Sequence, residues 1–187
     1  GYCFVHGGDP LVDTMDRTLL QVRDHVLQAV RAGKTMRAVY QEVDSMVEAA
    51  GFVNVHRYYP HRVIGHRLGR IQVGPLHKLR WLGFGLPTYV KLMSRTWLSK
   101  LFPKWIESPL WNDGRECDHP LREGVWAVEP HIATPDQCLG SKWEEILVVT
   151  KDNAYWLNDD ATHCRRGVAA GWWHSTQRPA VEALAGT

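Results

Sequence analysis

PLREGVWAVEP, residues 120–130, is an apolar strand pattern that ends on Glu129 and is stopped by a proline. Two other segments carry side chains that can bind a metal ion: the imidazole of GHRLG at residues 65–69 and the carboxylates of WEEILVVT at residues 143–150. A carboxylate at the end of a buried strand needs a partner, because burying an unpaired charge is costly. A divalent cation would serve, and so would an arginine or a helix N-terminus. One imidazole and two carboxylates suit manganese, iron, cobalt or zinc.

Strand alternation separates the two adjacent glutamates of the third segment. In a regular strand Glu144 shares a face with Ile146, whereas Glu145 shares the opposite face with Leu147. Only one of the two glutamates can therefore face a common site.

Bulk composition is typical of one globular domain. The chain has 187 residues, of which 44% are hydrophobic and 22% charged, and its formal net charge is +2. That charge is too small to indicate a nucleic-acid partner, and no zinc-finger or helix-turn-helix pattern is present. The four cysteines are scattered without a CxxC pair, which is typical of reduced thiols in a cytoplasmic protein. No apolar run reaches transmembrane length, and the N-terminus has no signal-peptide pattern.

Two amphipathic helices are predicted in the first third of the chain. After a strand at Gly1–His6 they span about residues 11–31 and 35–50, and Gly33 and Gly51 end them. Further strands are predicted at residues 124–128, 146–150 and 155–157. We expect one domain over residues 1–167 and a loosely held tail over residues 168–187, which the tryptophan pair at 172–173 could dock.

An insert at about residues 75–111 is rich in tryptophan and positive charge. Within it, residues 89–102 can form a helix with Tyr89, Met93, Trp97 and Leu101 on one side. Three explanations fit this insert: a lid or dimer surface over a site, peripheral contact with an anionic membrane, or packing of the apolar side on the domain.

In the same order along the chain, four segments resemble the pita-bread metallohydrolases, which include aminopeptidase P, prolidase, methionine aminopeptidase and creatinase. They are the helix end AAGF at residues 49–52, GHRLG, PLREGVWAVEP and EEILVVT. The resemblance covers most of residues 1–160 and implies an α+β pita-bread fold. It also implies that His66 and Glu129 hold one divalent ion and that Glu144 bridges to a second. The implied enzyme is a homo-oligomeric hydrolase like Xaa-Pro aminopeptidase or prolidase, which cleaves a peptide or related amide bond with metal-activated water.

The sequence departs from the family in its acidic residues. Family members supply two aspartates from a hairpin before the first helix, and Gly1–His6, where that hairpin should end, contains no acid. The aspartates lie upstream or are missing, and without them only a mononuclear His-Glu-Glu site could form. Asp9, Asp13 and Asp16 follow, in positions that favour helix caps over ligands.

Its histidines depart from the family as well. His61 lies five residues before His66, one more than usual, and Val73 replaces a later substrate-contacting histidine. His61 and His131 are the candidate catalytic residues, although His61 also suits a surface loop. These changes leave two alternatives open: a lyase or small-molecule hydrolase on the same fold, or an inactive relative that acts as a binding module.

Overall fold

The computed structural model describes residues 9–69, 80–81, 84–103 and 105–175, so the strand predicted at Gly1–His6 lies outside the described residues. Its helices are α1 (Pro10–Arg31), α2 (Met36–Ala49), α3 (Leu86–Leu101) and α4 (Thr162–Ala169), with 3₁₀ turns at Val55–Tyr58, Pro60–Arg62 and Arg115–Cys117. Its strands are β1 (Val53–Asn54), β2 (Gly65–Arg67), β3 (Arg80–Trp81), β4 (Phe84–Gly85), β5 (Leu110–Trp111), β6 (Gly124–Val128), β7 (His131–Ala133), β8 (Gly140–Lys142), β9 (Glu145–Val149) and β10 (Ala154–Trp156).

Local capping signals set the ends of the two long helices. The Asp9 side chain accepts a hydrogen bond from the Leu11 amide at 2.8 Å at the start of α1, which confirms Asp9 as a cap. Thr35 caps α2 in the same way by accepting from the Ala38 amide at 3.1 Å. Between the helices Gly33 has a φ of 69°, the left-handed conformation expected of a helix-ending glycine.

The central sheet is antiparallel, with strand order β10-β9-β6-β2-β5, and a smaller sheet has the order β1-β7-β8. Pro130 lies where β6 passes into β7, yet the pairing register continues through this point. Val128 pairs with Glu145 in the larger sheet, and three residues further His131 pairs with Lys142 in the smaller one. The two sheets are therefore parts of one long bent hairpin, with its register unbroken.

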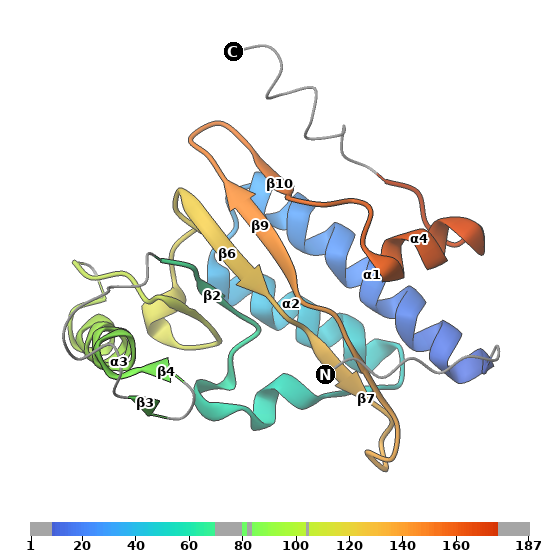
Figure 1. Cartoon of the computed structure of the whole chain (residues 1–187), viewed down its shortest axis with the longest axis horizontal. Helices are drawn as coiled ribbons and strands as arrows, with labels where there is room; N and C mark the ends of the chain where they lie inside the picture. Colours follow the sequence, from blue (N-terminus) through green and yellow to red (C-terminus); the bar gives the residue numbers. More distant parts are fainter. Residues whose placement is uncertain (1–8, 70–79, 82–83, 104, 176–187) are drawn as a thin grey trace.

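α1 and α2 cover one face of the central sheet (Figure 1). Two buried indoles connect the layers: Trp111 of β5 donates to the Met36 carbonyl at 2.6 Å, and Trp143, just before β9, donates to the Leu19 carbonyl at 3.2 Å. These indoles bury large apolar surfaces and still satisfy their N–H groups. The opposite face, which bears Val125 and Ile146, is only partly buried. The core thus lies between the sheet and α1 and α2.

The C-terminal segment begins within α4, since residue 168 is near the end of that helix. Trp173 is buried, and its indole donates to Asp24 of α1 at 2.8 Å. Arg166 of α4 pairs with Asp13 and, at 2.7 Å, with Asp16. The tail is therefore docked through Trp173 as far as it is described, and residues 176–187 lie outside the described part.

The insert contains α3, three residues longer at its start than the predicted helix. The predicted apolar stripe does not pack inward along its length, since Trp97 and Leu101 are exposed. Thr96 and Ser99 are buried instead. In the described residues, no helix is long and apolar enough to cross a membrane.

Candidate metal centre

Glu129 and Glu144 lie directly opposite each other on the bent hairpin. The unbroken register fixes this, because both residues lie between the pairs Val128–Glu145 and His131–Lys142. Residues opposite each other in an antiparallel pair have Cβ atoms about 4.5–5.5 Å apart. The two carboxylates therefore project from neighbouring positions on one face.

His66 of β2 projects from the same face. It pairs with Ala127, which lies two residues before Glu129 on the next strand. Side chains two residues apart on a strand share a face, and diagonal neighbours across a ladder are about 7–8 Å apart. The structure thus brings the three predicted ligands to one face of the sheet, away from α1 and α2.

A lysine already neutralises part of this site. The Lys142 ammonium donates to Glu129 Oε2 at 3.0 Å, and Glu144 projects from the same strand face. Burial alone would lower the pKa of Lys142, but the hydrogen bond and charge of Glu129 raise it overall, so the ammonium keeps its proton. Sequence reasoning missed Lys142, although its place two residues before Glu144 was a usable signal.

The donor set fits a divalent ion in its chemistry: an imidazole and two carboxylates on one partly solvated face. The donor atoms are not tightly gathered, however. Among the described residues, only Glu145, His163 and Cys164 form a trio with donor atoms all within 4.8 Å of one another. A cation at His66, Glu129 and Glu144 would have to draw these side chains together and displace the Lys142 ammonium from Glu129.

His131 belongs to the same face, opposite Lys142, and is held by a residue that sequence reasoning missed. The Tyr59 hydroxyl lies 2.5 Å from His131 Nδ1. Burial lowers the pKa of His131, and the Lys142 charge lowers it further, while burial raises the pKa of Tyr59. The phenol therefore donates to a neutral imidazole, which places the ring proton on Nε2.

His61, the other catalytic candidate, lies in the exposed turn Pro60–Arg62 with a φ of 63°. Its backbone carbonyl accepts a hydrogen bond from Asn112 Nδ2 at 3.1 Å. The contact that fixes this residue is therefore made by its backbone, and the side chain faces solvent.

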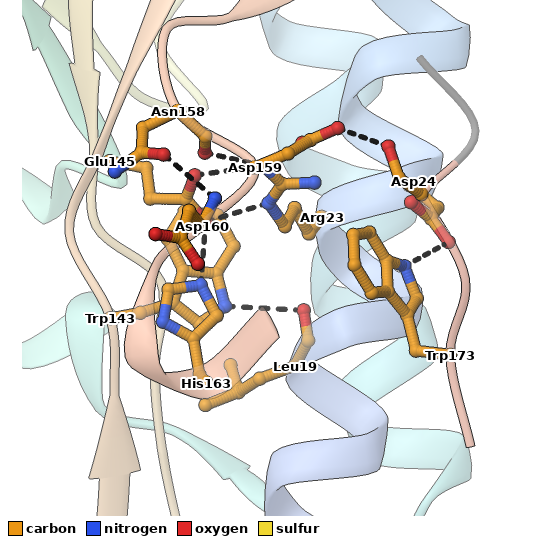
Figure 2. Close-up of polar contacts among 11 residues, drawn as sticks. Leu19, Arg23, Asp24, Trp143, Glu145, Asn158, Asp159, Asp160, His163 and Trp173 are labelled. Atoms are coloured by element: carbon orange, nitrogen blue, oxygen red, sulfur yellow. Dashed lines mark hydrogen bonds and ion pairs between the residues drawn. The ribbon is translucent and has the colours of Figure 1, made fainter. Parts of the chain in front are cut away.

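On the opposite face, Glu145 forms a buried ion pair with Arg23 of α1 (Figure 2). Arg23 is 1% exposed, and its Nε and Nη2 atoms donate to the two carboxylate oxygens at 2.6 and 2.9 Å. His163 Nε2 lies 2.6 Å from Glu145 Oε1. The Arg23 guanidinium also lies 5.0 Å from the Trp156 ring centroid and 5.3 Å from that of Trp173.

In the trio of Glu145, His163 and Cys164 the carboxylate already has a cationic partner. Arg23 engages both oxygens of Glu145, so a metal ion there would have to displace this buried guanidinium. The cluster instead attaches β9 and α4 to α1. Sequence reasoning missed this role of Arg23, although the residue lies four positions after Leu19, on the apolar side of its helix.

Comparison with known proteins found one matching family and a few partly similar solved structures. Residues 3–151 match the sequence model of metallopeptidase family M24. Similar solved structures include an X-Pro aminopeptidase from Thermotoga maritima (18% identity, 81% of this chain and 32% of that one, TM-score 0.47). Another is a dipeptidase from Pyrococcus horikoshii, with 17% identity and a TM-score of 0.46. That match covers 79% of this chain and 31% of the dipeptidase chain. This chain spans about a third of the length of each, and none of the curated proteins matches it significantly.

The family match covers most of the sequence, and the structure has the expected mixture of helices and antiparallel sheet. The chain therefore belongs to metallopeptidase family M24, a family of divalent-metal-dependent enzymes with the α+β pita-bread fold.

Proposed function

We propose that this chain forms the metal-binding part of a peptidase-like hydrolase, with His66, Glu129 and Glu144 as ligands. The observation that carries the proposal is the register that sets Glu129 opposite Glu144, on the face that also bears His66. We further propose a peptide or related amide substrate, of the kind cleaved by Xaa-Pro aminopeptidases and prolidases, for which the family membership is the support.

A bound divalent ion would supply Lewis-acid chemistry, lowering the pKa of a bound water and polarising a carbonyl. The residues of the chain would contribute orientation and hydrogen bonds. His66 would present a neutral imidazole, and the two glutamates would supply the negative charge that holds the cation. Tyr59 holds the His131 ring with its proton on Nε2, so His131 offers a donor to a substrate oxygen on this face.

Lys142 supports a second candidate function, a relative that binds a partner without catalysis. Its ammonium lies 3.0 Å from Glu129 Oε2 and supplies the charge that a cation would otherwise bring. A protein that relies on this internal cation has no electrostatic need for a metal at Glu129. The two candidates make opposite predictions about metal binding.

Calorimetric titration of the metal-free protein with Mn²⁺ and Zn²⁺ separates them. If the chain is a hydrolase, it should bind about one or two equivalents of metal ion saturably. Glu144→Gln should then weaken the metal affinity at least about tenfold. Glu123→Gln is the matched control, because this glutamate is also exposed and lies on the same hairpin before β6. Equal affinities in the two variants would refute the ligand assignment, and no uptake by the parent protein would favour the binding module.

Substrate identity needs a separate measurement. Hydrolysis of Xaa-Pro dipeptides and tripeptides by the metal-loaded protein, compared with peptides lacking proline, tests the proposed specificity. Turnover of small amides but not of peptides would favour the small-molecule hydrolase.

A further inference from the structure

The outward side of α3 carries large apolar side chains that the domain does not cover. Val90, Trp97 and Leu101 recur at steps of seven and four residues, so they lie along one side of the helix. All three are exposed, and Trp97 is 62% exposed. The buried residues of the helix are Thr96 and Ser99, and the partly buried Leu92 lies between them on the same side. The largest apolar side chains of this helix are therefore the exposed ones, whereas an ordinary surface helix turns its apolar side to the core.

Two further exposed aromatic side chains follow the helix in the chain. Phe102 is exposed, and Trp105 is 86% exposed. We call the surface made by these five residues, Val90, Trp97, Leu101, Phe102 and Trp105, the α3 outer face. Exposed apolar surface concentrated on one element is the usual mark of a binding surface.

Positive charge borders this face. Lys91 and Arg95 lie along one side of the apolar stripe, and Lys100 lies along the other; all three are exposed. Residues 86–106 contain no aspartate or glutamate in the sequence, whereas the whole chain has a net charge of only +2. A partner must therefore offer both apolar surface and negative charge.

A second copy of the chain meets only the first requirement. Pairing two α3 outer faces about a two-fold axis would bring the basic borders of both copies together, and like charges in contact repel. An anionic lipid surface meets both requirements, because basic residues bind its headgroups while tryptophan and leucine enter the boundary with the acyl chains.

We propose that the α3 outer face binds an anionic membrane surface, with α3 lying in the plane of the interface. The position of the helix allows this, since α3 lies at an edge of the molecule, on the other side of the central sheet from α4 (Figure 1). The proposal is independent of catalysis at the metal centre, and the two can fail separately.

Flotation of the full chain with lipid vesicles tests the proposal. We expect partitioning onto vesicles of phosphatidylcholine mixed with phosphatidylserine to exceed that onto phosphatidylcholine alone by on the order of 100-fold. Three basic residues near the surface supply this difference at about fivefold each. Added salt should weaken the binding.

Two kinds of variant dissect the contributions. The double variant Lys91→Gln with Arg95→Gln should lower the partition coefficient roughly 25-fold. Leu101→Ser should lower it about five- to tenfold, because the half-exposed leucine would no longer enter the interface. Leu157→Ser is the matched control, since Leu157 is 56% exposed and Leu101 51%, but Leu157 follows β10, away from α3. Circular dichroism checks that each variant folds.

Four outcomes would overturn the proposal. One is the absence of flotation with either vesicle. The second is equal binding to both vesicle types, which would remove the role of the basic border. The third is an equal loss of binding in Leu101→Ser and Leu157→Ser. If sedimentation velocity shows self-association that Leu101→Ser abolishes, the occupant of the face is instead a second copy.

Discussion

Glu145→Gln and Glu144→Gln should change different properties of this protein. The first should lower its stability, and the second should weaken metal binding. Glu145 is buried against Arg23, which is itself buried. Glutamine at 145 would leave the guanidinium paired with the Asp159 carboxylate, at 2.9 Å. Breaking a buried ion pair by removing one partner costs about 3–5 kcal/mol, and the retained contact with Asp159 favours the lower end, about 3 kcal/mol. Glu144 is exposed, so Glu144→Gln should change the free energy of unfolding by less than about 0.5 kcal/mol.

Urea unfolding followed by tryptophan fluorescence measures both changes. With an m value of about 2 kcal/mol/M, Glu145→Gln should lower the unfolding midpoint by about 1.5 M, and Glu144→Gln by less than about 0.25 M. A loss of about 3 kcal/mol is a large part of the 5–15 kcal/mol typical of a domain, so Glu145→Gln should still fold, but marginally.

The result that would refute this reasoning is a similar midpoint for both variants, or a larger loss for Glu144→Gln. Either would mean that Glu145 does not face α1, and the assignment of Glu144 to the candidate metal centre would fail with it. Metal titration of the same two proteins completes the contrast, since only Glu144→Gln should weaken binding.

Three further predictions concern acid stability, the competing ammonium and a close backbone approach. Burial would raise the pKa of Glu145, but hydrogen bonds from His163 and Arg23 lower this pKa overall. The ionised carboxylate therefore stabilises the folded state fully above its unfolded-state pKa of 4.5, and this contribution is lost as the pH falls through the folded-state pKa. In unfolding experiments at successive pH values, the stability difference between parent and Glu145→Gln should therefore shrink below about pH 4.5. Lys142→Met should tighten Mn²⁺ binding about five- to tenfold in calorimetry by freeing Glu129, whereas Lys151→Met, at an exposed turn position, should not. Gly65→Ala should lower the melting temperature by about 3–10 °C in a thermal scan, because its Cβ would lie 2.5 Å from a backbone carbonyl oxygen of β6; an unchanged melting temperature would contradict the close packing of β2 on β6.

Signals within a few residues of each other were enough to predict α1, α2, most of α3 and the strands β6, β9 and β10, but not α4 or short strands such as β2 and β7. Asp9 and Thr35 cap the helices that follow them, and strand alternation correctly separates Glu144 from Glu145. The partner that makes Glu145 the buried one could not be found in this way. Arg23 lies 122 residues away, and its place on the apolar side of α1 suggests burial without indicating which residue it pairs with.

The orientation of α3 was beyond sequence reasoning for a different reason. Its periodicity is real, but periodicity shows only that one side of a helix is apolar, and not that this side is covered. The side against the domain has Thr96 and Ser99, whose hydroxyls donate to backbone carbonyls within the helix at 2.8 Å. Small side chains satisfied by their own helix can be buried without further partners, and this leaves the tryptophan side exposed.

The same hairpin raises the question of what keeps Glu144 and Glu145 on their proper faces. A shift of one residue in the pairing of β9 would exchange every side chain between the two faces. Neither glutamate opposes such a shift, since Glu144 would then meet Arg23 in place of Glu145. The aliphatic residues oppose it weakly, because both faces of β9 carry them: Ile146 and Val148 on one, Leu147 and Val149 on the other.

The residues just before β9 oppose such a shift more strongly. Trp143 is buried, stacks on His163 with ring centroids 5.8 Å apart, and donates to the Leu19 carbonyl. A one-residue shift would expose this indole and turn the Lys142 ammonium toward the core, where an unpaired charge is costly. Lys142 and Trp143 thus favour the register in which Glu144 faces the candidate metal centre, although neither is one of its proposed ligands.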